Sequence, residues 1–179
     1  DGENAVPMIA AQDHKQVFDG DEGPNTGGMG AYSPAPVVDQ AMTDRIMADI
    51  ILPTAKGMVA EGRPYKGVLF AGLMITGDGP KLIEHNVRFG DPECQVMMMR
   101  LKSDMLEALL ACAEGRLNKL KLKWHDDAAL AVVMASNGYP GTYEKGSVIH
   151  GIDKAEEIEN AVVFHAGTDR ENGDLIATG

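Results

Sequence analysis

The sequence is poor in aromatic residues, in cysteine and in positive charge. Aromatic side chains make up 5% of the 179 residues, so the eleven methionines must fill part of any core. Cys94 and Cys112 form no CxxC pair, and we expect them to be buried, reduced thiols. The formal net charge is −11, and the densest basic cluster, at 119–123, has the alternation of a solvated strand. A chain this acidic is not expected to bind nucleic acid or an anionic membrane.

Long apolar runs are missing as well. No stretch approaches the roughly 18 apolar residues of a membrane helix, and no signal peptide is recognisable. Together with the reduced thiols, these absences favour a cytoplasmic protein without a membrane partner. The chain begins with Asp1 rather than methionine, and both of its ends have strand-like sequence, which favours a fragment of a longer protein.

The hydrophobic spacing changes near residue 122, from mixed helix and strand patterns to short strands. We therefore predict an α+β fold in which residues 1–122 form helices on an antiparallel sheet and residues 123–179 form a small, mainly β domain. Pro53 either kinks a helix or begins a second one, and Ser103 is the expected N-cap of a later helix. The predicted elements are a strand at 5–10, a loop at 19–36, helical sequence at 39–61, a hairpin with strands at 67–76 and 81–88, helices at 91–101 and 103–114, and strands at 128–135, 147–150, 162–166 and 175–178.

One stretch, KLIEHNVRFGDPE from Lys81 to Glu93, carries the clearest chemistry. In an extended strand alternate side chains share a face, so Glu84, Asn86 and Arg88 would lie together. The opposite face, suited to packing, would hold Ile83, His85 and Val87. A carboxylate and an amide oxygen suit Mg²⁺, which completes its shell with water and phosphates, and the nearby guanidinium can hold an anion. Taken alone, so short a pattern is more often a solvated strand face with an ion pair.

A second candidate is the glycine-rich segment GPNTGGMG from Gly23 to Gly30. Its backbone N–H groups can approach an anion closely. It is not a Walker A loop, because Met29 stands where lysine is required, and it lacks the third glycine of a dinucleotide fingerprint. A purely structural Ω-loop is the plain alternative. The preceding QDHK, residues 12–15, reads on its own as a polar strand end at the surface.

Several motifs in this order resemble the glycinamide ribonucleotide synthetases, the phosphoribosylamine–glycine ligases of the ATP-grasp family. The resemblance covers nearly the whole chain, with one departure at His85, where the family pattern favours phenylalanine and where we expect a core role. The motifs are QDHK, the glycine-rich segment continued as AYSP, RFGDPE, RLKSD at 100–104, GYPG-x-Y at 138–143 and FHAGT at 164–168.

The resemblance implies an enzyme that uses ATP to join glycine to 5-phosphoribosylamine, giving glycinamide ribonucleotide, ADP and phosphate through glycyl phosphate. It implies that Glu84 and Asn86 bind Mg²⁺ or Mn²⁺ on the ATP phosphates and that Arg88 steadies the reacting carboxylate. The other residues that it places at the substrates are Asp13, His14, Lys15, Asn25, Thr26, Gly27, Gly28, Gly30, Asp91 and Glu93.

The resemblance also implies that the amino-terminal part of the enzyme, with the groups that hold adenine, lies outside this chain. We therefore expect the fragment alone to be inactive. Two alternatives stay open. Another ATP-grasp carboxylate–amine ligase would share E-x-N but should not carry QDHK, TGGMGAYSP and RFGDPE together. A non-catalytic ATP-grasp-like domain would keep the fold for binding or assembly.

Overall fold

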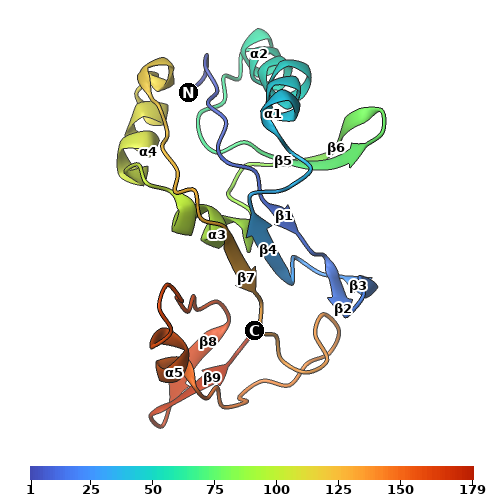
Figure 1. Ribbon diagram of the computed structural model, residues 1–179, viewed down its shortest axis with the longest axis vertical. Coiled ribbons are helices and arrows are strands. Elements are labelled where there is room, and N and C mark those ends of the chain that lie inside the picture. The colour runs from blue at the N-terminus through green and yellow to red at the C-terminus, as the bar shows by residue number, and fades with distance from the viewer. The chain divides into compact units, whose positions relative to one another are not determined.

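The computed structural model describes every residue from Asp1 to Gly179 (Figure 1). The chain forms two compact units: Asp1–His14 with Gly30–Val132, and Lys15–Met29 with Val133–Gly179. Each unit is thus built from two separated stretches of chain. The predicted division at residue 122 stays a prediction. No helix has both the length and the hydrophobicity needed to cross a bilayer.

The first unit combines helices with antiparallel strands, and the second has four strands and one short helix, in agreement with the predicted α+β class. The first unit contains β1 (Gln12–Asp13), β4 (Gly30–Ser33), α1 (Gln40–Ile46), the π-helical η1 (Met47–Ile51), α2 (Leu52–Ala60), β5 (Phe70–Thr76), β6 (Gly79–Asn86), α3 (Glu93–Arg100), α4 (Met105–Ala113), the 3-10 helix η2 (Leu117–Lys119) and β7 (Ala129–Val132). The second contains β2 (Gln16–Phe18), β3 (Glu22–Asn25), α5 (Ile152–Glu156), β8 (Thr168–Glu171) and β9 (Asp174–Ala177).

A three-stranded antiparallel sheet, in the order β1–β4–β7, covers one side of α3 (Figure 1). Small side chains make the close packing possible, and Ala31 and Ser33 are 0% exposed. The buried face of α3 consists of residues 93, 96, 97 and 100, which is the spacing of one helical stripe. The opposite face of the sheet is open, since Leu130 and Val132 on β7 are 73% and 71% exposed.

Gly30 explains why β4 lies inside a segment that was predicted to be loop. It is buried, and a Cβ at this position would lie 2.7 Å from the carbonyl oxygen of Ala131 on β7. Glycine is therefore required for the two strands to pair. The prediction of a continuous loop over 19–36 is wrong for this reason, since β3 and β4 both fall within it. The strand predicted at 5–10 is absent, because this stretch has no partner strand.

Pro53 lies in the first turn of α2, which confirms that it starts a second helical segment. A proline inside a regular helix would clash with the carbonyl group four residues earlier. The preceding turn is widened into the π-helix η1, so α1 and α2 follow one another without a loop. At the start of α1, the Asp39 side chain caps the helix by accepting a hydrogen bond from the N–H of Met42, 2.8 Å away.

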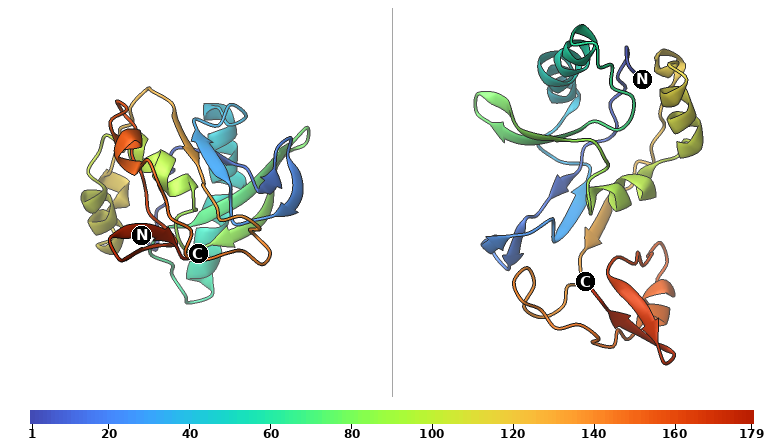
Figure 2. Two further views of the ribbon diagram at one scale, coloured as in Figure 1. Left: turned by 90° about the horizontal axis from the view of Figure 1, so that it is seen from below. Right: turned by 180° about the vertical axis from the view of Figure 1, so that it is seen from behind.

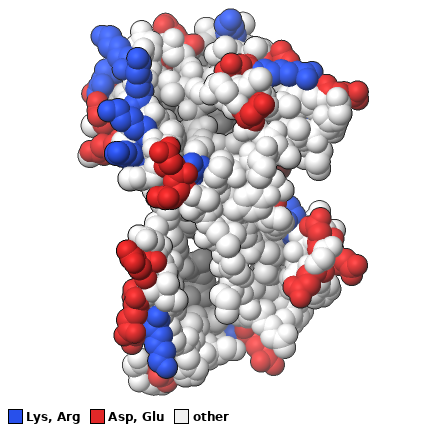
Figure 3. All heavy atoms as spheres, in the orientation of Figure 1, with Lys and Arg blue, Asp and Glu red and all other residues white.

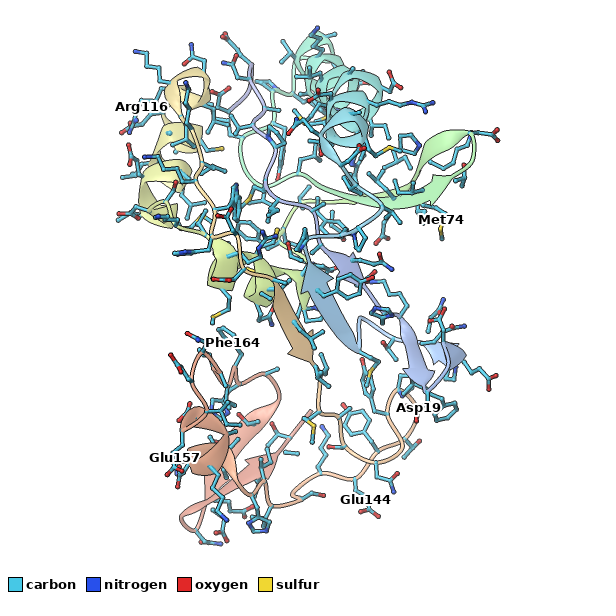
Figure 4. The ribbon with its side chains drawn as sticks, viewed as in Figure 1. Asp19, Met74, Arg116, Glu144, Glu157 and Phe164 are labelled. Atoms are coloured by element: carbon cyan, nitrogen blue, oxygen red, sulfur yellow. The ribbon has the colours of Figure 1, made fainter.

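The hairpin β5–β6 is the predicted one, but β5 begins at Phe70 rather than at residue 67, and β6 runs from Gly79 to Asn86 rather than from 81 to 88. Its loop is the pair Gly77–Asp78, and the guanidinium of Arg45 on α1 donates to the carbonyl oxygen of Asp78 at 2.9 Å. Helix α1 accordingly lies against β6, which the second view of the ribbon also shows (Figure 2). The Met74 side chain on β5 is 56% exposed and points away from the hairpin (Figure 4).

The face assignment on β6 is only partly correct. Gly72 pairs with Glu84 and Leu73 pairs with Leu82, so Ile83 is an extra, bulged residue and is 64% exposed. The strand ends at Asn86 rather than at residue 88, and Val87 is 72% exposed. The predicted packing of these two apolar residues is therefore wrong, because the bulge and the early strand end remove them from the regular pleat.

His85 does take an interior position. Its ring nitrogen Nε2 lies 3.2 Å from the hydroxyl oxygen of Thr54 on α2. That hydroxyl donates its proton to the carbonyl oxygen of Ile50 at 2.7 Å, so it accepts from the histidine, which places the ring proton on Nε2. His85 thus joins β6 to α2, as expected for a packing residue.

Other local predictions need correction. The N-cap of α4 is Asp104 rather than Ser103, because the Asp104 carboxylate accepts from the N–H of Leu106 at 2.8 Å. Cys94 and Cys112 are half-buried rather than buried. On the face drawn in Figure 3, charged side chains of both signs lie over the region of α4. The exposed lysines at 119, 121 and 123 lie in η2 and irregular chain rather than in a strand.

In the second unit, β2 pairs with β3 and β8 pairs with β9. The strand predicted at 175–178 is confirmed as β9, but the one at 162–166 is absent, and residues 147–150 contribute only a single bridge, from Val148 to Ile176. The true partner of β9 is β8, joined to it by Asn172 and Gly173, which both have positive φ, 51° and 95°. Asn-Gly is a strong hairpin signal, which the sequence analysis overlooked.

Candidate functional site

Glu84 and Asn86 lie at the end of β6, and their side chains touch. The Asn86 amide nitrogen donates a hydrogen bond of 2.9 Å to a Glu84 carboxylate oxygen. The two residues therefore share a face, as the alternation of a strand requires. Because Asn86 uses its N–H group on the glutamate, its amide oxygen and the second carboxylate oxygen remain as acceptors for a ligand.

Gly72 provides room for this pair. It stands directly opposite Glu84 in the hairpin, and a Cβ at this position would lie 3.1 Å from Cγ of Glu84. Side chains opposite one another in neighbouring strands compete for the same space. A glycine at position 72 therefore lets the glutamate side chain lie over its partner strand.

The oxygen atoms of Glu84 and Asn86 fit a Mg²⁺ or Mn²⁺ ion. Magnesium commonly takes one or two protein oxygens and completes its shell with water and substrate phosphates. No group of three or more His, Cys, Asp and Glu side chains in residues 1–179 could hold a metal ion. The donor set is thus suited to a metal that arrives with a phosphate ligand, and not to a cage built by the protein alone.

The residues that follow β6 have different surroundings. Arg88 is exposed, and its guanidinium donates to the carbonyl oxygen of Phe89 at 2.8 Å. Asp91 is exposed and accepts from the side-chain amide of Gln95 at 2.8 Å. Glu93 begins the buried stripe of α3, is only 5% exposed and lies against Gly90. The first two can meet a ligand at the surface without rearrangement of the core.

The turn after β6 also affects the pKa of the Cys94 thiol. Burial raises its pKa, and the carboxylate of Asp91 raises it further because a thiolate beside a negative charge is disfavoured. In a separate place, burial and then Cys112 raise the pKa of the Tyr65 hydroxyl, which donates to the carbonyl oxygen of Val68 at 2.8 Å. Neither group is poised to ionise near neutral pH.

Asp13 and His14 are neighbours in the chain but point to opposite faces of the three-stranded sheet. Asp13 pairs with Ala31, whose side chain is buried against α3, and one carboxylate oxygen of Asp13 is buried as well. The exposed His14 ring lies 5.6 Å from that of Tyr32 on the open face. The structure therefore gives the two residues separate environments.

Lys15 and the glycine-rich segment are held together in the second unit. The Thr26 hydroxyl donates to the carbonyl oxygen of Lys15 at 2.8 Å and accepts from the N–H of Gly28 at 3.0 Å. The Lys15 ammonium group donates to the carbonyl oxygen of Gly27 at 3.1 Å. Asn25, on the exposed strand β3, pairs with Gln16. The part of the segment from Thr26 to Gly28 is thus held by hydrogen bonds to Lys15 and within itself.

The role of Arg100 was not predicted from the sequence. This guanidinium is buried, at 6% exposure, and donates to the hydroxyl of Ser33 at 3.0 Å and to the carbonyl oxygen of His125 at 3.1 Å. Ser33 in turn donates to the carbonyl oxygen of Ala10 at 2.8 Å, two residues before β1. The burial of Arg100 could have been predicted from the helical spacing, because Arg100 lies seven residues after Glu93 and therefore on the same face of the helix.

Antiparallel sheets with helices, and a hairpin that presents a carboxylate and an amide before a helix, agree with the family model that assigns this part of the chain to an ATP-grasp domain. The model of the phosphoribosylglycinamide synthetase ATP-grasp (A) domain matches residues 1–94, and that of the C domain matches residues 129–179. The chain belongs to the phosphoribosylglycinamide synthetase family.

Individual relatives agree with the family match. The chain is 62% identical over 179 residues to phosphoribosylamine–glycine ligase of Agrobacterium fabrum and 60% identical over 183 residues to the chloroplastic ligase of Arabidopsis thaliana. These matches cover the whole chain but only 42% and 34% of the two relatives. A crystal structure of phosphoribosylamine–glycine ligase from Thermotoga maritima matches with a TM-score of 0.83 and 33% identity, over 99% of this chain and 43% of that one. The chain therefore spans less than half of each.

Proposed function

We propose that the complete protein containing this chain ligates glycine to 5-phosphoribosylamine at the expense of ATP. The observation that carries the proposal is the hydrogen-bonded pair Glu84–Asn86 on β6, in a chain that belongs to the phosphoribosylglycinamide synthetase family. A pair of hard oxygen ligands is what a metal–nucleotide complex requires from the protein. ATP, glycine and phosphoribosylamine are the proposed partners, and a cytoplasmic location, without membrane or nucleic acid, is part of the same proposal.

The proposed reaction has two steps. A carboxylate oxygen of glycine attacks the γ-phosphorus of ATP, the bond from that phosphorus to the bridging oxygen breaks, and ADP leaves. The amine nitrogen of phosphoribosylamine then attacks the carbonyl carbon of glycyl phosphate. Phosphate leaves with the former glycine oxygen, and the nitrogen loses a proton to form the amide. No side-chain nucleophile is needed, so the protein acts by positioning and charge neutralisation.

Glu84 and Asn86 would hold Mg²⁺ or Mn²⁺, and a bound ion would offset the negative charge of the ATP phosphates. Arg88 is exposed and is bonded only to the neighbouring backbone carbonyl of Phe89, so its guanidinium can exchange that bond for an anionic oxygen of the substrate. Asp91 and Glu93 follow directly. We place the substrate side at Asp13, His14, Lys15 and the residues Asn25, Thr26, Gly27, Gly28 and Gly30.

Isotope transfer tests the proposed carboxylate activation. The complete protein is supplied with ATP, Mg²⁺, phosphoribosylamine and glycine labelled with ¹⁸O in both carboxylate oxygens. We expect ADP release that requires both glycine and the amine, with one ¹⁸O atom in each phosphate released. Phosphate without label would contradict a glycyl phosphate intermediate.

The same assay separates the two alternatives. Turnover with other amines or acids, but not with glycine and phosphoribosylamine, would identify a different ATP-grasp ligase. Metal-dependent nucleotide binding without any turnover would identify a non-catalytic domain. The relatives named phosphoribosylamine–glycine ligase favour the proposed pair of substrates.

A further inference from the structure

Tyr139 lies against the glycine-rich loop, although none of the roles above uses it. A Cβ added to Gly27 would have the Tyr139 hydroxyl oxygen as its nearest neighbour, at 4.0 Å. Both residues belong to the second compact unit, which also contains Lys15. Residues more than a hundred positions apart therefore meet at one point of the loop.

Backbone hydrogen bonds close the turn that carries Tyr139. The N–H of Tyr139 donates to the carbonyl oxygen of Ser136 at 3.1 Å, and the N–H of Gly141 donates to that of Gly138 at 2.9 Å. Gly138 has a φ of 96°, and a Cβ at this position would collide with the carbonyl oxygen of Thr142. The backbone that carries the Tyr139 ring is thus held within its own turn.

The polar groups around Gly27 are suited to an anion. The Lys15 ammonium group donates a hydrogen bond to the Gly27 carbonyl oxygen at 3.1 Å, so a cationic donor lies at this point of the loop. The Tyr139 hydroxyl makes no hydrogen bond within the chain, and it is not among the buried polar atoms. A phenol that packs for its ring alone has no need of a hydroxyl beside a glycine-rich loop.

We propose that Tyr139 is a substrate-binding residue, whose hydroxyl donates a hydrogen bond to an anionic oxygen held at Lys15 and Gly27. The inference rests on the proposed function, because the anion is a phosphate or carboxylate oxygen of one of its three substrates. Phosphate and carboxylate both offer an anionic oxygen that can accept a hydrogen bond from the Tyr139 hydroxyl, and the experiment below shows which substrate supplies it.

The matched pair of variants is Tyr139→Phe and Tyr143→Phe. Both remove only a hydroxyl, and the two rings lie 6.0 Å apart in the same turn, with Lys145 next to the ring of Tyr143. Titration calorimetry on the complete protein measures binding of ribose 5-phosphate, glycine and Mg²⁺–ATP separately. Steady-state kinetics on the same variants give kcat and the KM of each substrate.

We expect Tyr139→Phe to weaken one of the three probes about tenfold and to raise the KM of the matching substrate by a similar factor. The kcat, the Tm and the other two affinities should stay within about twofold, and Tyr143→Phe should match wild type throughout. Equal affinities of Tyr139→Phe and wild type for all three probes would overturn the inference, as would binding of none of them by wild type.

A second variant tests the site without altering the tyrosine. In Gly27→Ala the new methyl group meets no atom closer than 4.0 Å, so the loop should accept it, but it narrows the space beside the Tyr139 hydroxyl. We expect the same probe to lose affinity, whereas unchanged binding of that probe would contradict the site. If wild type turns over and the probes are unaffected, this inference fails while the proposed function stands.

Discussion

Buried charge is concentrated on one helix of this molecule. Glu93 and Arg100 stand at the two ends of α3, at 5% and 6% exposure. A negative group in the first turn and a positive group in the last both agree with the helix dipole. Arg100 also joins α3 to β4, since its guanidinium donates to the Ser33 hydroxyl at 3.0 Å. Arg100 therefore provides a polar contact between α3 and β4, where the buried strand residues are the small Ala31 and Ser33.

Removal of the Ser33 hydroxyl should loosen this interface. Ser33→Ala leaves one N–H group of the buried Arg100 without an acceptor and the carbonyl oxygen of Ala10 without a donor. We expect a local loss of about 2 kcal/mol, which makes amide exchange of β1 and β4 about 30-fold faster. Hydrogen–deuterium exchange of the complete protein measures it. Ser147→Ala, at an exposed serine, is the control, and equal exchange in the two variants would contradict the role of this polar contact.

Cys94 gives a pH-dependent prediction. Burial and the Asp91 carboxylate both raise the pKa of its thiol, so little thiolate exists at neutral pH. In a Cys112→Ser background, alkylation of Cys94 by iodoacetamide should be slow at pH 8 and should accelerate as the pH rises further. Asp91→Asn removes a negative charge, lowers the pKa and should increase the rate at pH 8. An unchanged or slower rate would show that Asp91 does not act on the thiol.

Residue positions that depend on local periodicity were predictable, and those that depend on distant partners were not. The common face of Glu84 and Asn86 follows from two-residue alternation, and the 2.9 Å hydrogen bond between them confirms it. The exposure of Ile83 depends on a bulge, which the pairing of β6 with β5 determines. The partnership of Arg100 with Ser33 joins residues 67 positions apart, which no local pattern reports.

At the scale of elements, the hairpin β5–β6 positions the two residues of the candidate metal site, Glu84 and Asn86. Gly72→Ala would place a methyl group 3.1 Å from Cγ of Glu84, so the glutamate must shift by a few tenths of an ångström. We expect the Mg²⁺ concentration for half-maximal activity of the complete protein to rise several-fold, because the metal requires near-ideal geometry. In Gly77→Ala the methyl group meets nothing within 4 Å, so this variant should behave as wild type. Equal Mg²⁺ requirements in both variants would contradict the role of Gly72.

Element types were predicted best where the signals are strong and local. The hairpin at 67–88 and the helices that became α3 and α4 were correct, because turn residues and helical spacing specify them. The strands β4 and β8 are the clearest of those that were missed, which also include the short β1, β2 and β3. The first depends on a glycine whose value lies in close approach to β7, and the second follows from the Asn172–Gly173 turn, which the apolar run at 162–166 obscured.

At the scale of the whole molecule, the chain spans 42% of the Agrobacterium relative and 43% of the Thermotoga structure. The candidate site residues would hold a metal and small anions, and the resemblance places the adenine-binding groups outside these 179 residues. We therefore expect the isolated chain to show no glycine-dependent release of ADP. An assay of the purified 179-residue chain with ATP, Mg²⁺, glycine and phosphoribosylamine measures this, and release above the rate without glycine would contradict it.

The central claim is that Glu84 and Asn86 hold the metal of an ATP-dependent ligase. The most direct measurement compares Glu84→Gln with Glu144→Gln in the complete protein, by formation of glycinamide ribonucleotide at saturating Mg²⁺. Both glutamates are exposed, so both variants should fold as wild type does. We predict that Glu84→Gln lowers kcat/KM for ATP at least about 100-fold, because charge neutralisation at the phosphates is lost. Near-normal turnover of Glu84→Gln would contradict the account.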